Sequence, residues 1–348
     1  MAVMTNTPDN TQTNTPHAST RTRHLGRRVL LGVARTLGAV FALILGLAIA
    51  GVGYEAVSSM GDAERYPAPG TLVDVGGYQL HIQCAGTGSP TVVLDAGLGG
   101  MSLDWYLVQP EIANTTRVCA YDRAGMGWSN PGPQPRTPSQ IAGELHTLLS
   151  SAGVPGPYVL VGHSLAGKNV RLFAIQHPEQ VAGMVLVDAR GESMDANISP
   201  ADRAAFEQAL ADATTQYGML RRLGLVRLIG ADQWGAPAMP REIRTEGALL
   251  KTGQRGLETN SAEGLQRATD DAQLQAASSL GDRPLIVLAS EVNIETLPGW
   301  PETQRQQAAL STKGRLVVVE GSGHYIQWDN PAVVIDAVRQ VVTEARGR

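Results

Sequence analysis

The residues with the clearest capacity for chemistry lie in Val159-Leu-Val-Gly-His-Ser-Leu-Ala-Gly167, where a serine separates two apolar runs. Glycine stands two positions before Ser164, and alanine and glycine follow behind it. A strand that reverses into a helix within so few residues strains the serine backbone and leaves room for small neighbours alone. The segment therefore predicts a nucleophile elbow that exposes the Ser164 hydroxyl. The backbone N–H of Leu165, at the start of the helix, would stabilise an oxyanion that forms beside it.

A serine hydroxyl needs a general base, most often a histidine that is oriented by a carboxylate. Of the seven histidines, His324 lies in the glycine-rich segment Glu320-Gly-Ser-Gly-His-Tyr-Ile326, just past the last predicted strand. A short turn at this point can carry the imidazole back over the sheet. His163 adjoins the serine, but we expect its side chain to point elsewhere. We therefore expect His324 to be the base for Ser164.

The orienting carboxylate has two candidates. Asp188 ends the apolar run Met184-Val-Leu-Val-Asp188, one predicted strand after the nucleophile, so it would share a sheet edge with Ser164 and His324. Glu291 lies just past the later apolar run Leu285–Ala289. We favour Asp188 and keep Glu291 as the alternative acid.

A second oxyanion donor is expected in the loop Asp95-Ala-Gly-Leu-Gly-Gly100, whose glycines let the backbone approach a reacting oxygen. The N–H of Leu98 is our candidate partner for the N–H of Leu165. A glycine cluster can also cradle phosphate, but this one lacks the Lys-Ser/Thr ending of phosphate-binding loops. The loop therefore favours acyl chemistry over nucleotide binding.

Short apolar runs past residue 70 predict the strands that would hold these residues. Helical segments separate the later runs; one opens at Thr137-Pro-Ser-Gln140, a capping box with proline at the first helical position, and another at Asn330-Pro331. This alternation predicts an α/β fold, a mostly parallel eight-stranded sheet with helices on both faces. The predicted strands are Leu72–Val75, Tyr78–Cys84, Thr91–Asp95, Arg117–Tyr121, Tyr158–Gly162, Met184–Val187, Leu285–Ala289 and Leu316–Val319.

One long interval shows helical character and no convincing strand. We interpret residues 190–282 as a helical lid over the strand ends, inserted between core segments 71–189 and 283–346. Its apolar residues either line a substrate pocket or pack the lid onto the core. Lys168 also has two interpretations: a cation in a helix's first turn opposes the helix dipole, so it is either a solvated side chain or a substrate contact. The lid residues concerned are Leu220, Leu223, Leu225 and Trp234.

The N-terminal region predicts a membrane anchor. Residues 1–28 are expected to form a disordered cytoplasmic tail, residues 29–54 a transmembrane signal anchor and residues 55–70 a linker. The uncharged stretch Thr36–Tyr54 would span about 28 Å as a helix. Arginines before it and acidic residues after it predict a single pass with the N-terminus inside and the catalytic domain extracytoplasmic. A cleaved signal peptide, read at Ala48-Ile-Ala50, is the alternative and would give a secreted protein.

Composition narrows the classes of partner. The chain has 348 residues, a formal net charge of −4 and 17% charged residues. No basic stripe with interleaved aromatic residues occurs, so we expect no nucleic-acid partner. Cys84 and Cys119 are too few for a soft-ligand metal site, and we expect no metal or cofactor. They form either a disulfide, which export would favour, or two independent buried thiols.

Four segments, taken in order, resemble the α/β-hydrolase superfamily over roughly Thr71 to Val342. The resemblance implies strand order 1-2-4-3-5-6-7-8 with an antiparallel second strand, an elbow serine, a late histidine and an acid after the sixth or seventh strand. The loop Asp122–Ser129 is expected to be a structural turn. Relatives with an aspartate nucleophile, the haloalkane dehalogenases and epoxide hydrolases, are disfavoured by the serine. The segments are Ala96-Gly-Leu-Gly99, Tyr121-Asp-Arg-Ala-Gly-Met-Gly-Trp-Ser129, Gly162-His-Ser-Leu-Ala-Gly167 and Gly323-His324.

These residues predict a membrane-anchored or exported serine hydrolase that cleaves a carboxylester or lactone through an acyl-enzyme. Its partners would be a small-molecule acyl substrate and the lipid bilayer. An acyltransferase differs in the acceptor alone, and an aminopeptidase would need a charged pocket for a free amine. A catalytically inactive ligand-binding module on the same scaffold is a further alternative.

Overall fold

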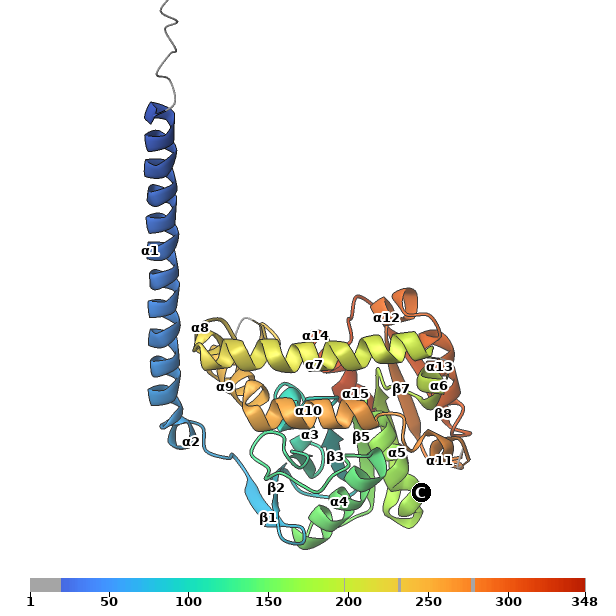
Figure 1. Cartoon of the computed structure of the whole chain (residues 1–348). Coiled ribbons are helices and arrows are strands. Elements are labelled where there is room, and N and C mark those ends of the chain that lie inside the picture. The colour runs from blue at the N-terminus through green and yellow to red at the C-terminus, as the bar shows by residue number, and fades with distance from the viewer. Residues whose placement is uncertain (1–19, 197, 231–232, 277–278, 348) are drawn as a thin grey trace, which may run out of the picture. The chain divides into compact units, whose positions relative to one another are not determined.

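The computed structural model describes residues 20–196, 198–230, 233–276 and 279–347. The chain divides into two compact units, one that ends at Gly53 and one that spans Tyr54–Arg348. Helix α1 (Thr20–Ser59) continues beyond both predicted ends of the anchor. Its segment Arg27–Ser59 (Figure 1) is long and apolar enough to cross a membrane, with a mean hydropathy of 2.2, and the most apolar part of this segment is not buried. The predicted disorder of residues 1–19 lies outside the described residues.

The second unit is built on one sheet that, within the described residues, has eight strands in the order β1-β2-β4-β3-β5-β6-β7-β8. Strand β2 runs antiparallel to both neighbours, and the other pairs are parallel. The predicted fold class and the strand order that the resemblance implied are therefore confirmed. The strands are β1 (Thr71–Asp74), β2 (Gln79–Ala85), β3 (Thr91–Asp95), β4 (Val118–Tyr121), β5 (Tyr158–His163), β6 (Val181–Val187), β7 (Leu285–Ser290) and β8 (Gly314–Val319).

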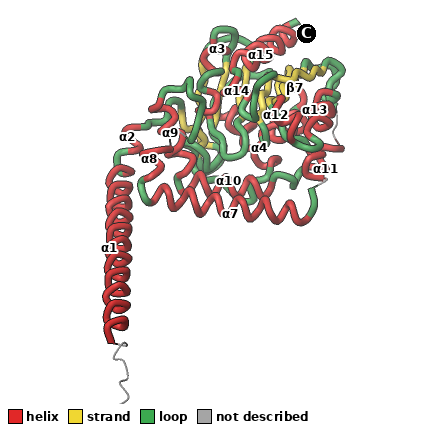
Figure 2. The backbone as a smooth tube through the Cα atoms, turned by 90° about the horizontal axis from the view of Figure 1, so that it is seen from above, coloured by secondary structure: helices red, strands yellow, loops and turns green. Residues whose placement is uncertain are grey.

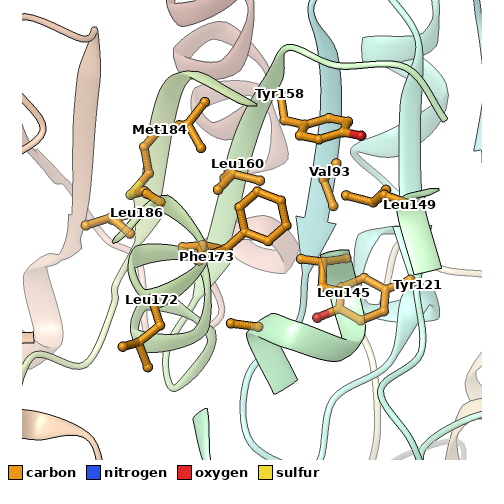
Figure 3. Packing of buried hydrophobic residues seen from close by; sticks show 14 of the residues in the cluster. Val93, Tyr121, Leu145, Leu149, Tyr158, Leu160, Leu172, Phe173, Met184 and Leu186 are labelled. Carbon is orange, nitrogen blue, oxygen red and sulfur yellow. The ribbon is translucent and has the colours of Figure 1, made fainter. Parts of the chain in front are cut away.

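Both faces of the sheet are covered by helices. On one face Leu160 of β5 packs in a cluster with Phe173 of α5 (Ala166–Gln176) and Leu145 of α4 (Pro138–Ser151), as Figure 3 shows. On the other face, neighbouring Val159 and Val161 pack with α3 (Gln109–Ala113) and α15 (Pro331–Arg346). Alternate strand residues thus enter opposite cores, which explains why the central strands are continuously apolar.

Local signals in the sequence set the helix starts. The Thr137 side chain accepts a hydrogen bond from the Gln140 N–H at the start of α4, and Asn330 accepts one from Val333 at the start of α15. Both caps satisfy amide groups that have no partner within the first helical turn, so these predictions are confirmed. Shorter elements complete the unit: α2 (Asp62–Arg65), η1 (Ser102–Trp105), η2 (Pro178–Gln180), α12 (Glu291–Thr296), α13 (Trp300–Ala308) and α14 (Ile326–Asp329).

The described residues between β6 and β7 form six helices joined by loops, with no strand among them. Two of these helices, α7 (Pro200–Arg222) and α10 (Gln254–Gln266), lie side by side in Figures 1 and 2. Whether this insertion acts as a lid stays a prediction. Its helices are α6 (Glu192–Ala196), α7 (Pro200–Arg222), α8 (Leu225–Ile229), α9 (Arg241–Thr252), α10 (Gln254–Gln266) and α11 (Asp271–Ala276).

Lys168 of α5 fastens this insertion to the sheet domain. Its ammonium group is fully buried and donates to Asp195 at 2.7 Å, to Asp271 at 2.5 Å and to the carbonyl oxygen of Arg267 at 2.8 Å. Both interpretations of this lysine, a solvated side chain and a substrate contact, are therefore wrong. Burial alone would raise the pKa of Asp195, but hydrogen bonds and charge from Arg190 and Lys168 hold it well below its usual range.

Cys84 of β2 and Cys119 of β4 form a disulfide between directly paired positions of the two strands. Of the two alternatives that the sequence left open, the bonded one is correct. The bond closes a loop with a sequence separation of 35 residues. It lies in an antiparallel pair, where facing side chains are close enough to be joined.

Replacing both cysteines by alanine should lower the free energy of unfolding of residues 54–348 by about 3–4 kcal/mol, because an unfolded chain without the cross-link gains loop entropy. Urea unfolding of the oxidised wild type and the double variant measures the difference. A loss below about 1 kcal/mol would contradict a stabilising role for this bond.

Candidate active site

The elbow residue Ser164 follows β5 directly and has a backbone φ of +52°. Its N–H donates to the Val187 carbonyl, and its own carbonyl accepts from Gly167 and Arg190. These bonds hold a conformation that L-residues rarely adopt. A Cβ at Gly162 would lie 2.8 Å from the Ala166 carbonyl oxygen, so glycine is needed before the serine. The backbone geometry agrees with the elbow that the sequence predicts.

The structure brings Ser164, His324 and Asp188 together. The Nε2 atom of His324 lies 2.9 Å from the Ser164 hydroxyl oxygen, and its Nδ1 atom lies 2.7 Å from Oδ2 of Asp188. His324 comes from the loop between β8 and α14, whereas the carboxylate follows β6. Serine, imidazole and carboxylate thus form a continuous hydrogen-bonded chain, the arrangement that lets a histidine remove a serine proton.

Asp188 is fully buried and has, like the serine, a positive φ, of +41°. Its Oδ1 accepts hydrogen bonds from the N–H of Ser290 and the indole of Trp300. Its Oδ2 accepts from the amide of Asn293 and faces His324. Four donors from three segments, the junction of β7 and α12, helix α13 and the His324 loop, therefore compensate a charge that burial would otherwise penalise.

Glu291, the alternative acid, lies elsewhere. It is the first residue of α12, and its carboxylate accepts a hydrogen bond from the N–H of Gly321 at 2.8 Å. That bond fixes the turn after β8. The carboxylate that accepts the hydrogen bond from Nδ1 of His324 is that of Asp188 instead.

The two proposed oxyanion donors, Leu98 and Leu165, line one cavity with Ser164. Within the described chain, neither backbone N–H donates a hydrogen bond to another backbone group. A Cβ at Gly97 would lie 2.8 Å from Nδ1 of His163 and 3.0 Å from Cβ of the serine. Glycine is therefore required at the point where this loop passes the serine. The N–H groups of Leu98 and Leu165 are both available to bind an oxygen.

His163 has a positioning role that the sequence did not indicate. Its ring is buried, and Nε2 lies 2.9 Å from the carbonyl oxygen of His324. Burial, together with the neighbouring histidine, holds the pKa of His163 well below its usual value. A neutral ring donates from Nε2 to that carbonyl, so His163 supports the backbone of the loop that carries His324.

Arg123, in the loop expected to be a structural turn, links three parts of the site. Its guanidinium is 2% exposed and pairs with Asp95 at 2.8 Å and with Glu263 of α10 at 2.9 Å. It also donates to the carbonyl oxygens of Ala96 and Gly97. The arginine thereby ties the loop Asp95–Gly100, which carries the proposed donor Leu98, to the helical insertion, a contact between residues far apart in sequence.

A cavity of about 280 Å³ opens in front of the serine, and Asp104 is its most unusual wall residue. Its carboxyl is buried, and within the described residues Oδ1 has no hydrogen-bond partner. Burial raises the pKa of Asp104 to about 7, although the charge of Lys251 opposes the shift. Described residues include no group of His, Cys, Asp and Glu that could hold a metal ion. The cavity is lined by Gly97, Leu98, Asp104, His163, Ser164, Leu165, Arg190, Phe206, Arg267, His324 and Tyr325.

This fold and this elbow define an α/β-hydrolase-type protein. A family model described as "Alpha/beta hydrolase family" matches residues 92–337, so the chain belongs to the alpha/beta hydrolase family. It is 26% identical over 301 residues to a protein from Hormonema carpetanum named "Probable transporter efuK", a match that covers 78% of this chain. The chain spans about half the length of such curated relatives: 42% of that protein and 52% of an uncharacterized one from Schizosaccharomyces pombe.

Solved structures give the same fold. A thermophilic esterase from Thermogutta terrifontis superposes with a TM-score of 0.61 at 21% identity, covering 79% of this chain and 98% of the esterase. Est816, described as an N-acyl homoserine lactone degrading enzyme, superposes with a TM-score of 0.58 at 20% identity, covering 78% of this chain and 99% of Est816. At these identities the likeness supports the fold alone.

Asp104→Asn should stabilise residues 54–348 at pH 8 but not at pH 4. The pKa of Asp104 rises from 3.8 to about 7 on folding, so its ionised form costs stability as pH rises through that interval. The gain should grow from pH 4 to pH 7 and reach roughly 3–4 kcal/mol above it. Urea unfolding at pH 4, 6 and 8 measures it.

The control is Asp336→Asn, which removes an exposed carboxyl from α15. It should show no gain that grows with pH. An Asp104→Asn gain that is the same at all three pH values would contradict the burial of an ionisable group.

Proposed function

We propose that this protein is a serine hydrolase that cleaves a carboxylester or lactone through an acyl-enzyme. The observation that carries the proposal is the chain of contacts from Asp188 through His324 to Ser164, with distances of 2.7 and 2.9 Å. The structural neighbours include an esterase and a lactone-degrading enzyme, so the shared fold accommodates this chemistry in other proteins. Serine at the elbow argues against the aspartate-based chemistry of epoxide hydrolases.

In the proposed first step, Nε2 of His324 accepts the hydroxyl proton while the oxygen of Ser164 bonds to the substrate's carbonyl carbon. Asp188 holds the imidazole in the tautomer that has its proton on Nδ1, and it stabilises the imidazolium that forms. The amides of Leu98 and Leu165 donate hydrogen bonds to the oxyanion. Removing one such donor would lower the rate by a factor of about 10²–10³. His324 then gives its proton to the departing alcohol.

In the second step, His324 accepts a proton from water, the resulting hydroxide oxygen bonds to the acyl carbon, and the ester bond to Ser164 breaks. The serine oxygen recovers its proton from the imidazolium, and the carboxylic acid leaves. An alcohol in place of water would make the same site an acyltransferase, so the acceptor decides between these two activities.

The test is turnover of p-nitrophenyl esters of increasing chain length by residues 54–348. Ser164→Ala should abolish turnover above background, and Asp188→Asn should lower kcat by about 10⁴ because the imidazole loses its tautomer. Glu291→Gln is the matched control, since it removes a carboxylate near the same loop without touching His324, and it should keep nearly full activity.

Equal losses in Asp188→Asn and Glu291→Gln would contradict the assigned acid. Folded wild type that neither turns over esters nor reacts with a fluorophosphonate would support the inactive binding module instead. Release of the acyl group to an added alcohol faster than to water would support the acyltransferase.

An aminopeptidase is a second candidate because of one observation. Asp104 presents a buried carboxyl with an unpaired oxygen to the cavity, and a free amine would satisfy it. Aminoacyl p-nitroanilides test this activity. Turnover of these anilides that Asp104→Asn removes, with ester turnover retained, would favour the peptidase.

We further propose that α1 anchors the protein in a membrane, with the N-terminus inside and the catalytic unit outside the cytoplasm. Support comes from the exposed apolar segment Arg27–Ser59 and from the arginines that precede it. The disulfide between Cys84 and Cys119 fits an oxidising compartment. We propose that the helical insertion then acts as a lid over the extracytoplasmic site.

Alkaline phosphatase fused after Ser59 should be active, because that enzyme needs an oxidising compartment for its disulfides. Fusion after Arg27, before the apolar segment, is the matched control and should be inactive. The reverse pattern would contradict the orientation. Recovery of the full chain from the membrane fraction distinguishes an anchor from a cleaved signal peptide.

A further inference from the structure

A cluster of four charges joins the end of α1 to the helical insertion. Glu55 pairs with Arg221 at 3.0 Å and with Arg227 at 2.7 Å, and Asp62 pairs with the same arginines at 3.2 and 2.6 Å. All four residues belong to the unit that begins at Tyr54. Because the carboxylates and guanidinium groups neutralise one another, the cluster holds α8 beside the point where the apolar run ends.

Helix α8 carries an apolar face that is exposed among the described residues. Leu225, Leu228 and Ile229 are spaced so that they share one side of the helix, and they are 36%, 58% and 49% exposed. Met219, in the last turn of α7, is 56% exposed. Large exposed apolar side chains that cluster on one helix mark a contact surface.

The same helix forms a wall of a second cavity, of about 500 Å³, inside the insertion. Leu225 and Ile229 belong both to the exposed face and to the wall, so the cavity reaches that face. Most of its lining surface is apolar, contributed by side chains such as Leu220 and Trp234. A volume of this size accommodates an acyl chain.

One residue in the wall of the insertion cavity lies against the loop that carries the proposed oxyanion donor Leu98. Lys251 and Asn260 line the insertion cavity, and a Cβ at Gly99 would lie 2.4 Å from Oδ1 of Asn260. The neighbouring residue, Leu98, lines the cavity in front of Ser164. Neighbouring residues of this loop therefore contact the wall of the insertion cavity and line the cavity of the proposed nucleophile.

We propose that the apolar face of α8 is a membrane-contact surface, seated in the bilayer interface, through which the insertion cavity takes the acyl chains of lipid-borne esters. The inference deepens the proposed hydrolase and rests on the proposed anchor. The bilayer is the occupant because Glu55, which follows the apolar run directly, is paired with Arg227 of this same helix. An amphipathic helix held at that height buries its apolar side in the interface.

The first experiment measures depth and needs no catalysis. The two cysteines are bonded to each other, so Leu228→Cys introduces one thiol that can carry an environment-sensitive NBD group. In the full chain reconstituted into phosphatidylcholine vesicles, this label should show blue-shifted emission and lose at least half of it to nitroxide-labelled lipids. Val292→Cys on α12, 46% exposed, is the matched control and should show neither effect.

Labels that behave alike at positions 228 and 292 would overturn the membrane contact. A blue shift at 228 without quenching by lipid nitroxides would also overturn it and would point to a protein partner. Neither result depends on turnover, so this failure is distinguishable from failure of the proposed hydrolase.

The second experiment compares substrates on the reconstituted full chain. Leu228→Ser changes an exposed residue outside both cavity walls. It should lower turnover of a long-chain ester embedded in vesicles by about tenfold, with turnover of soluble p-nitrophenyl butyrate unchanged. Equal effects on the two substrates would overturn the route through the insertion cavity, even if the ester activity itself is present.

Discussion

The buried carboxylate of Asp188 is the constraint on which the site depends. A charge at 0% exposure must be compensated by hydrogen bonds. Its donors come from the junction of β7 and α12, from α13 and from the His324 loop. Satisfying this one charge therefore brings three segments of the chain to the edge of the sheet where Ser164 projects. The positive φ of Asp188 and of the serine is the local strain that this network maintains.

Two buried cations, Arg123 and Lys168, join the sheet domain to the helical insertion. Arg123 connects the oxyanion loop to Glu263, and Lys168 connects α5 to Asp195 and Asp271. Removing one partner of such a pair leaves a buried charge uncompensated, at a cost of about 3–5 kcal/mol. The insertion is consequently held to the sheet domain by charge as well as by apolar packing, and movement of these helices would disturb the loop that carries Leu98, one of the two proposed oxyanion donors.

Much of the fold follows from local sequence signals, because central strands buried on both faces are continuous Val and Leu runs and helices begin at capping residues. The strand order came with the resemblance. The position of Asp188 at the end of a strand favours it over Glu291 as the acid, and its contact with His324 agrees with this prediction. The ion pair of Arg123 with Glu263 could not be foreseen, since residues 140 apart leave no periodic signal. The sequence interpretations of Lys168, a solvated side chain or a substrate contact, are wrong for the same reason, because its ion-pair partners lie in an insertion distant in sequence.

The central claim is that Asp188 fixes the proton of His324 on Nδ1, facing the carboxylate. Proton NMR of residues 54–348 measures it directly, because a proton held between an imidazole and a carboxylate resonates far downfield of the backbone amides. Wild type and Glu291→Gln should both show this resonance, and Asp188→Asn should lose it. A resonance that persists in Asp188→Asn, or that disappears in Glu291→Gln, would contradict the account.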